Sequence, residues 1–223
     1  MDTTFRSMYL GLSSFMDANP ERRELLLGQR PPRFDMAYED RIARTTDDFE
    51  RVALKAEAAC DYFLLVGPPG TGKTSRALRR MVEHFYACPS TQVLLLAYTN
   101  RAVDEICRSL SAILPQVDYI RVGSELSCDA RFRKHLLENV LAECNNRREV
   151  NIRMADCRIY VGTVASIASK PELFKLKHFD VAIVDEATQI LEPQLLGILC
   201  ARFKDGRNGI CLLYTSPSPR DRG

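Results

Sequence analysis

The sequence predicts an α/β fold, in which a parallel β-sheet is flanked by helices. Short, continuous apolar runs recur along the chain, and segments with helical periodicity separate them. Continuous apolar runs are typical of strands buried on both faces, as in parallel sheets with crossover helices. A glycine-rich segment, GPPGTGKTS at residues 67–75, joins one of these runs to a helical segment. The length of 223 residues is compatible with one large domain or two small ones.

The expected strands are the apolar runs at residues 62–66, 92–97, 119–122, 158–161 and 181–184. Expected helices precede and separate these runs, over residues 21–28, 47–60, 73–86, 101–114, 127–148 and 192–202. The remaining residues before position 46 are mixed and polar, and we interpret residues 1–45 as an N-terminal extension.

The composition excludes several classes of protein. Hydrophobic residues make up 46% and the net charge is +2, so intrinsic disorder is excluded. No apolar stretch approaches the length of a transmembrane helix, and the N-terminus lacks a secretory signal. We therefore expect an intracellular, cytoplasmic protein without a membrane partner. A nearly neutral chain can still bind nucleic acid, because a groove requires only local positive charge.

The chain has eight cysteines but no C-x-x-C pair of the kind that binds zinc. Its three histidines lie far from one another in the sequence. Reduced, mostly buried thiols are therefore the expected state, and no resident metal cluster of cysteine and histidine is predicted.

Residues 67–74 match the pattern G-x-x-x-x-G-K-[ST] in every position. Glycines allow successive backbone N–H groups to curve around phosphate oxygens, and the following helix directs its positive end at the same anion. Lys73 is expected to reach the β- and γ-phosphates, and the Thr74 hydroxyl to bind Mg²⁺. The predicted nucleotide-binding residues are Gly67, Pro68, Pro69, Gly70, Thr71, Gly72, Lys73, Thr74 and Ser75.

A second motif, VAIVDE at residues 181–186, supplies carboxylates at the end of a predicted buried strand. Asp185 is predicted to position Mg²⁺, and Glu186 to orient and deprotonate an attacking water. An acidic pair after an apolar run is by itself a common start of a helix. Combined with the loop at residues 67–74, it predicts a catalytic site for nucleotide hydrolysis.

Four segments together resemble superfamily 1 helicases, in particular the branch of RNA-surveillance and flap-processing DNA helicases. They are GPPGTGKTS at 67–75, LLLAYTNRAVDEI at 94–106, YVGTVASI at 160–167 and VAIVDEATQI at 181–190. The resemblance implies a RecA-like, P-loop motor domain over residues 46–210. It further implies that the intact parent couples ATP hydrolysis to translocation along single-stranded DNA or RNA.

The resemblance also implies roles for single residues. Thr99, Asn100, Thr163 and Ser166 are expected to contact the backbone of a single strand, although Thr99 and Thr163 also suit helix caps. Gln189 is expected near the γ-phosphate, as a catalytic residue that couples the nucleotide to the strand. None of these residues distinguishes RNA from DNA, since phosphate contacts do not read the sugar.

The charge-rich residues 126–156 are expected to form a small, mainly helical insertion. Two interpretations of its basic residues stay open: a face that binds the single strand, or an ordinary solvated helix face. The basic residues concerned are Arg131, Arg133, Lys134, Arg147 and Arg148.

The chain departs from the family pattern in two places. Phe49 stands near the position where many members have a glutamine that reads adenine, so selectivity for ATP over GTP is in doubt. The family's next motif, expected after residue 202, is missing, and with it the second motor domain and its catalytic arginines. We therefore expect this chain to bind Mg-nucleotide weakly, to hydrolyse it poorly and not to translocate. The alternative hypothesis is a nucleotide-dependent switch or scaffold that does not unwind nucleic acid.

The last residues, 211–223, differ in style from the rest of the chain. Read back through the genetic code, residues 211–221 resemble the end of a transposase-type sequencing adapter. We therefore expect residues 211–223 to be a non-native tail and the native sequence to end near residue 210.

Overall fold

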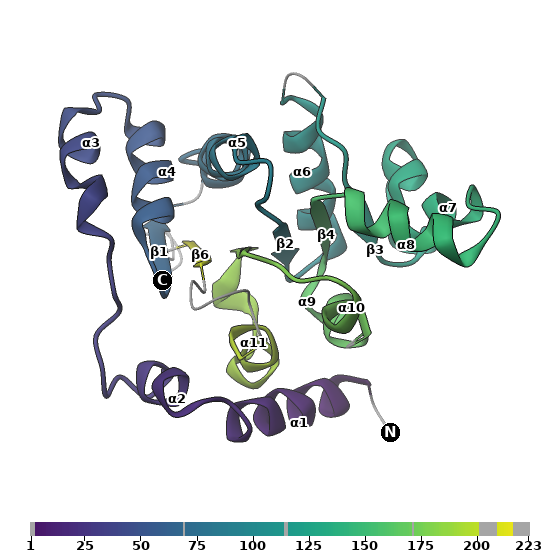
Figure 1. Cartoon of the computed structure of the whole chain (residues 1–223), viewed down its shortest axis with the longest axis horizontal. Coiled ribbons are helices and arrows are strands. Elements are labelled where there is room, and N and C mark those ends of the chain that lie inside the picture. The colour runs from purple at the N-terminus through teal and green to yellow at the C-terminus, as the bar shows by residue number, and fades with distance from the viewer. Residues whose placement is uncertain (1–2, 69, 114–115, 171, 201–208, 216–223) are drawn as a thin grey trace, which may run out of the picture.

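A computed structural model describes residues 3–68, 70–113, 116–170, 172–200 and 209–215. It confirms the predicted α/β class, because six strands form one sheet in the order β1-β6-β5-β2-β4-β3, with every pair parallel. The strands are β1 (Tyr62–Gly67), β2 (Val93–Ala97), β3 (Ile120–Val122), β4 (Ile159–Thr163), β5 (Val181–Asp185) and β6 (Gly209–Thr215). Figure 1 shows the sheet between two layers of helices.

The helices are α1 (Thr3–Met16), α2 (Pro20–Leu26), α3 (Glu39–Arg44), α4 (Asp48–Ala58), α5 (Arg79–Ala87), α6 (Asn100–Ser111), α7 (Leu137–Ala142), α8 (Arg147–Asp156), α9 (Val164–Ala168), α10 (Glu172–Leu176) and α11 (Glu192–Leu199). Short 3₁₀ turns are η1 (Met36–Tyr38), η3 (Glu125–Ser127), η4 (Ala130–His135) and η5 (Ala187–Gln189), and η2 (Lys73–Leu78) is a π-helical turn that leads directly into α5.

Alternation along the central strands builds two hydrophobic cores. Val93, Leu95 and Ala97 of β2 face the core that contains α4, α5 and α6. Leu94 and Leu96 face the opposite core, which contains α9 and α11. All of these side chains are buried, because helices cover both faces of the sheet. This explains why the central strands β2, β4 and β5 appear in the sequence as continuous apolar runs.

The helix expected over residues 127–148 is wrong. The structure instead has η3, η4, α7 and α8 between β3 and β4. Three side chains accept hydrogen bonds from backbone N–H groups a few residues further on and so begin new turns: Ser124 from Leu126, Asp129 from Arg131 and Asn146 from Glu149. Such local caps compete with a continuous helix.

The N-terminal residues contain a helix that the sequence analysis did not predict. Helix α1 packs against α11 (Figure 1), and their backbones approach closely at Gly11. A Cβ atom at Gly11 would lie 1.8 Å from the carbonyl oxygen of Pro193, so only glycine fits without a shift. The short distance between the helices follows from this missing side chain.

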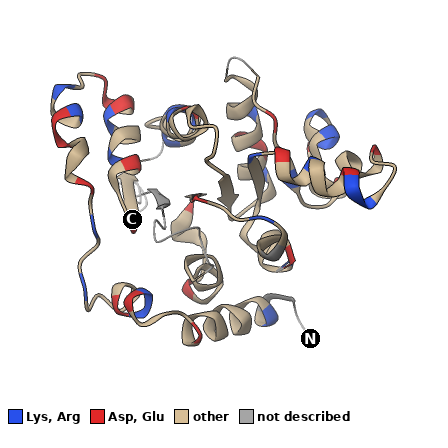
Figure 2. Ribbon diagram, in the orientation of Figure 1, with Lys and Arg blue, Asp and Glu red and all other residues tan. Residues whose placement is uncertain are grey.

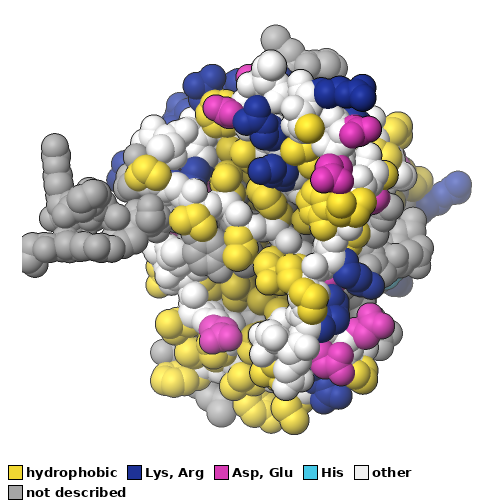
Figure 3. All heavy atoms as spheres, turned by 90° about the vertical axis from the view of Figure 1, so that its left-hand side faces the viewer, with side chains coloured by type: hydrophobic (Ala, Val, Ile, Leu, Met, Phe, Trp, Pro, Cys, Tyr) yellow, Lys and Arg dark blue, Asp and Glu magenta, His cyan; other side chains and the backbone are white. Residues whose placement is uncertain are grey.

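A buried carboxylate fixes the segment between α2 and α3. Asp61, immediately before β1, is 1% exposed and accepts hydrogen bonds from the side chains of Arg30 and Arg33. Burial favours the neutral form of Asp61, but these hydrogen bonds outweigh it and hold its pKa well below the usual range. The anchored segment carries exposed Phe34 and Met36. Figure 3 shows hydrophobic side chains interspersed with charged ones on the face that lies at the left-hand side of Figure 1.

Strand β6 crosses the junction predicted at residue 210. Its backbone pairs with β1 on one side and with β5 on the other, from Gly209 to Thr215. Residues on both sides of the junction therefore belong to one strand, and the non-native origin of residues 211–223 stays a prediction. Residues 201–208 and 216–223 lie outside the described part of the chain. Among the described residues, no helix is long and apolar enough to span a bilayer.

The close approach of α1 and α11 leads to a prediction. Gly11→Ala is expected to lower the free energy of unfolding by about 1–3 kcal/mol, because the new methyl group overpacks the contact with Pro193. Urea unfolding followed by circular dichroism measures this change. The matched control is Gly123→Ala, where no atom lies within 4 Å of the added Cβ. Equal stabilities of the two variants would contradict the close packing.

Candidate functional site

The glycine-rich loop follows β1 and curves back into η2. Gly70 and Gly72 have φ angles of 79° and 84°, a left-handed conformation that favours glycine. The carbonyl of Gly72 accepts hydrogen bonds from the N–H groups of Arg76 and Ala77, so the helix after the loop begins as a wide π turn. Pro69, a predicted binding residue, lies outside the described residues.

Lys73 lies against the loop from which it starts. Its Nζ donates hydrogen bonds to the carbonyl oxygens of Gly67 and Pro68, each at 2.6 Å. Burial lowers the pKa of Lys73, and the nearby Asp185 carboxylate opposes this shift. The loop thus holds its one cation close to the carboxylate that the sequence analysis assigned to the metal.

A single hydrogen bond joins the two predicted motifs. Thr74 Oγ1 donates to Asp185 Oδ2 at 2.5 Å, across 111 residues of sequence. The other carboxylate oxygen of Asp185 accepts the Glu186 N–H at 2.9 Å. Asp185 is 3% exposed, and burial raises its pKa, while the Thr74 hydroxyl, the Glu186 N–H and Lys73 act in the opposite direction.

The donor set at this point fits a magnesium ion. Thr74 and Asp185 present a hydroxyl and a carboxylate oxygen, the hard ligands that Mg²⁺ prefers alongside water and phosphate oxygens. The Asp185 carboxylate is buried, and a divalent cation would compensate the unfavourable burial of its charge. No cluster of three histidine, cysteine or acidic side chains suited to a fully protein-bound metal occurs among the described residues.

Glu186 takes an unusual backbone conformation. Its φ is 53°, the only positive φ of a described residue other than glycine. Burial and the neighbouring Asp185 raise its pKa, and Arg101 partly offsets them. A carboxylate with a raised pKa beside a metal site suits proton abstraction from water. Gln189, in η5, is exposed and does not line the cleft described next.

These groups line one cleft of about 420 Å³. Its predicted lining residues are Gly70, Gly72, Lys73, Thr74, Ser75, Asp185 and Glu186. Two further residues, Glu105 and Ser109, come from α6 and were missed. Ser109 Oγ donates to the Thr74 carbonyl at 3.3 Å. The i, i+4 spacing of Glu105 and Ser109 places them on one helix face, which was the available signal.

The residues predicted to contact a single-stranded nucleic acid lie at the carboxyl ends of the β-strands β2 and β4. Ala97 pairs with both Thr163 and Asp185, so these strand ends lie beside the end of β5. Thr99 and Thr163 accept hydrogen bonds from the N–H groups of Ala102 and Ser166, which makes both threonines N-caps. Thr163 also donates to Ser166 Oγ at 2.7 Å. For Thr99, capping and contact with a single-stranded nucleic acid are compatible, because a hydroxyl both accepts and donates. The Thr163 hydroxyl, on a residue that is 5% exposed, already accepts from and donates to Ser166.

One face of the Phe49 ring is covered by Arg76, a residue of the turn that follows the glycine-rich loop. The guanidinium of Arg76, in η2, lies 4.3 Å from the centre of its ring. This cation–π contact joins the first turn of α4 to the turn that follows the phosphate-binding loop.

Two of the five basic residues in the predicted insertion are paired with acids. Arg131 forms an ion pair with Asp129, and Arg133 forms one with Glu125. Figure 2 shows that the charged residues of this region lie on its helices and turns, away from the central strands. Neutralisation of Arg131 and Arg133 favours the interpretation as a solvated face for these two side chains.

The buried carboxylate leads to a prediction. Asp185→Asn is expected to raise the free energy of unfolding at pH 7 by about 1–2 kcal/mol, because it removes a desolvated charge at a functional site. A folded-state pKa above the unfolded value means that stability is complete below about pH 4 and falls as the pH rises through the folded pKa. The advantage of the variant should therefore vanish towards acidic pH.

Thermal unfolding from pH 4 to 8 measures this difference. Asp17→Asn, at an exposed position, is the matched control and should change stability by less than ~0.5 kcal/mol. A variant that is less stable than the parent at pH 7 would show that the ionised carboxylate stabilises the fold.

Comparisons with known proteins place these features in a family. A model of the AAA domain family matches residues 45–158, slightly more than half of the chain. Over 210 residues the chain is 28% identical to the DNA replication ATP-dependent helicase/nuclease JHS1 of Arabidopsis thaliana. This alignment covers 88% of this chain and 15% of that protein. Over 137 residues it is 30% identical to the RNA helicase Mov10l1 of Homo sapiens, covering 60% of this chain and 11% of that protein.

A solved structure, the UvsW helicase from bacteriophage T4, shares the fold with a TM-score of 0.50 at 10% identity, over 79% of this chain and 58% of that one. The chain spans less than a fifth of the length of the two curated relatives described above. The resemblance to helicases that the motifs indicate is confirmed. The match over residues 45–158 shows that the chain belongs to the AAA domain family.

Proposed function

We propose that residues 46–210 form an ATP-binding motor domain of a superfamily 1 helicase, with residues 1–45 as an extension and residues 126–156 as an insertion. The observation that carries this proposal is the hydrogen bond between Thr74 and Asp185, which joins the loop and the acidic strand end in one cleft. The relatives are named ATP-dependent helicase and RNA helicase, and the single-stranded substrate is carried over from that class.

In this proposal the chain's own residues bind and orient the triphosphate. The N–H groups of residues 70–75 and the start of η2 face the phosphates, and Lys73 exchanges its bonds to Gly67 and Pro68 for phosphate oxygens. Thr74 and Asp185 hold Mg²⁺, which when bound neutralises charge on the phosphate oxygens. Glu186 orients the attacking water and accepts its proton, and Gln189, which lies outside the cleft in η5, couples the bound nucleotide to the single strand.

The position of Glu186 favours hydrolysis over a pure switch. A switch that only binds nucleotide has no need for a water-activating acid, yet Glu186 lines the cleft beside Asp185 with a raised pKa. We propose that a second motor domain supplies the arginines that stabilise the transferring phosphate, a contribution of about 10³–10⁵ in rate. This chain alone then binds nucleotide weakly and hydrolyses it slowly.

We propose that Thr99, Asn100, Thr163 and Ser166 contact the phosphate backbone of a single strand. Support comes from their place at the carboxyl edge of the sheet, where β2 ends between β4 and β5. In this arrangement the single-stranded nucleic acid lies beside the nucleotide cleft. Motion of Asp185 and Glu186 at the end of β5 is then transmitted to it through the adjacent β-strands β2 and β4. An intracellular, cytoplasmic location is part of the proposal and agrees with the free thiols of the seven cysteines whose side chains the structure describes.

Nucleotide binding provides the first test. Lys73→Ala is expected to weaken binding of a fluorescent ATP analogue with Mg²⁺ by roughly tenfold or more, because charge-assisted hydrogen bonds to phosphate are lost. Lys55→Ala, on α4 and outside the cleft, is the control. GTP should bind within about threefold of ATP, since Phe49 cannot make hydrogen bonds that distinguish the bases. Unchanged affinity in the Lys73 variant would refute the nucleotide site.

Binding of a single strand provides the second test. Thr99→Asp preserves a capping side chain but adds a negative charge, so affinity for an oligonucleotide should fall about tenfold, or ~1.4 kcal/mol. The matched control is Ser124→Asp, which changes the exposed N-cap of η3 in the same way. Fluorescence anisotropy with labelled DNA and RNA measures both. An equal loss in the two variants would indicate non-specific repulsion rather than a contact at Thr99.

A further inference from the structure

Arg22 is a buried arginine whose charge is only partly compensated. It lies on α2 and is 6% exposed. Its Nε donates to the carbonyl oxygen of Leu199 at 2.7 Å, at the end of α11. Its two terminal nitrogens are buried and have no hydrogen-bond partner among the described residues. Arginine stays protonated in proteins, and an unpaired buried charge is strongly unfavourable.

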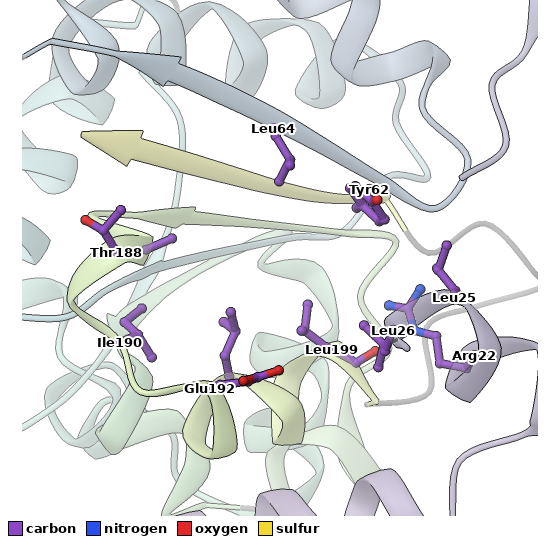
Figure 4. A pocket seen from close by; sticks show the side chains of 11 residues that line it. Arg22, Leu25, Leu26, Tyr62, Leu64, Thr188, Ile190, Glu192 and Leu199 are labelled. Carbon is purple, nitrogen blue, oxygen red and sulfur yellow. Dashed lines mark hydrogen bonds between the residues drawn. The ribbon is translucent and has the colours of Figure 1, made fainter. Parts of the chain in front are cut away.

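Arg22 borders a cavity that is separate from the nucleotide cleft. The cavity has a volume of about 540 Å³ and shares no lining residue with that cleft. Figure 4 shows the guanidinium of Arg22 with Leu25, Leu26 and Leu199 near it and Tyr62 on the opposite wall. The described lining is completed by Leu64, Ala187, Thr188, Ile190, Glu192 and Leu195, so most of the wall is apolar.

A structural role explains only one of the three nitrogens. The bond from Nε to Leu199 satisfies a carbonyl at the C-terminus of α11, where a positive charge is favourable. The Asp61 carboxylate also favours the charged form of Arg22 but is already bound by Arg30 and Arg33. Burial, the largest effect, lowers the pKa of Arg22. The two terminal nitrogens therefore remain available for an anion.

The chemistry of the walls selects the kind of anion. Two terminal guanidinium nitrogens match the two oxygens of a carboxylate. Arg22 is the only cation among the described lining residues, so a doubly charged phosphate would be left undercompensated. Glu192, at another part of the wall, disfavours a second negative group. The leucine and isoleucine side chains suit an aliphatic body, and the volume lies within the range of small-molecule sites.

We propose that this cavity binds an aliphatic monocarboxylate, whose carboxylate pairs with the terminal nitrogens of Arg22 and whose chain packs against Leu26, Leu64 and Leu195. The site lies between α2, α11 and the edge strand β1. It is independent of the proposed motor function, because none of its residues takes part in nucleotide or strand binding.

Titration calorimetry of the full chain with octanoate tests the proposal, with octan-1-ol as a neutral ligand of the same length. Octanoate should bind saturably at one site, and octanol should bind roughly tenfold more weakly or worse, since it lacks the charge. Arg22→Met should reduce octanoate affinity by a similar factor. Arg23→Met, the next residue on α2, removes the same charge outside the cavity and should leave affinity unchanged.

A second variant tests the cavity while keeping Arg22. Leu64→Trp, at a 47% exposed position on the wall, should fill the space and abolish binding without preventing folding. It carries the test if Arg22→Met fails to fold, as judged by thermal unfolding. Absence of saturable octanoate binding in the folded parent chain would overturn the proposal. Equal affinities for octanoate and octanol, or unchanged octanoate affinity in Leu64→Trp, would also overturn it.

Discussion

The buried carboxylate of Asp185 is the constraint on which the site depends. It lies at the carboxyl end of β5, inside a parallel sheet covered by helices on both faces. Its position is fixed by the Thr74 hydroxyl and by the N–H of Glu186. Because β6 is the one strand between β1 and β5, the loop after β1 reaches across a single strand end to make this bond. The strand order thus sets the distance between the two motifs.

The electrostatics of the cleft follow from the same burial. Desolvation raises the pKa values of Asp185 and Glu186 and lowers that of Lys73. The ionised form of each of these side chains is therefore less stable in the cleft than in water. Such an arrangement reduces the stability of the empty fold and would increase the free energy gained if phosphate and a divalent cation bind as proposed. Buried charges of this kind are typical of a binding site, whereas in a purely structural core they would only lower the stability of the fold.

The N-terminal residues up to position 45 pack against the sheet domain and form hydrogen bonds with it. Gly11 permits α1 to lie directly on α11, and Asp61 holds Arg30 and Arg33 at the start of β1. Arg22 caps α11 from α2 and borders a cavity of its own. Its two terminal nitrogens have no hydrogen-bond partner in the described part of the chain, whereas the Asp61 carboxylate is bound by two arginines. This difference is the reason to propose a ligand for Arg22 and a structural role for Asp61.

Local signals allowed much of the fold and the site to be predicted. The strands β2, β4 and β5 are continuous apolar runs because their burial on both faces leaves no polar alternation. The edge strand β1 is also an apolar run, but its Leu64 and Val66 are exposed. The loop at residues 67–74 and the acids at the end of β5 are recognisable because phosphate and metal chemistry require particular residues at fixed spacing. The helix expected over residues 127–148 failed because local caps at Ser124, Asp129 and Asn146 outweigh a helical pattern.

Only the tertiary structure decided which distant groups meet. The order of the strands, the packing of α1 on α11, and the entry of Glu105 and Ser109 into the cleft depend on contacts between residues far apart in sequence. The same holds for Arg22, which the sequence alone does not distinguish from its neighbour Arg23 on the same short helix. By itself the sequence determined the chemistry of the loop and of the strand ends, because that chemistry is encoded locally. The burial that tunes their charges arises only when both faces of the sheet are covered.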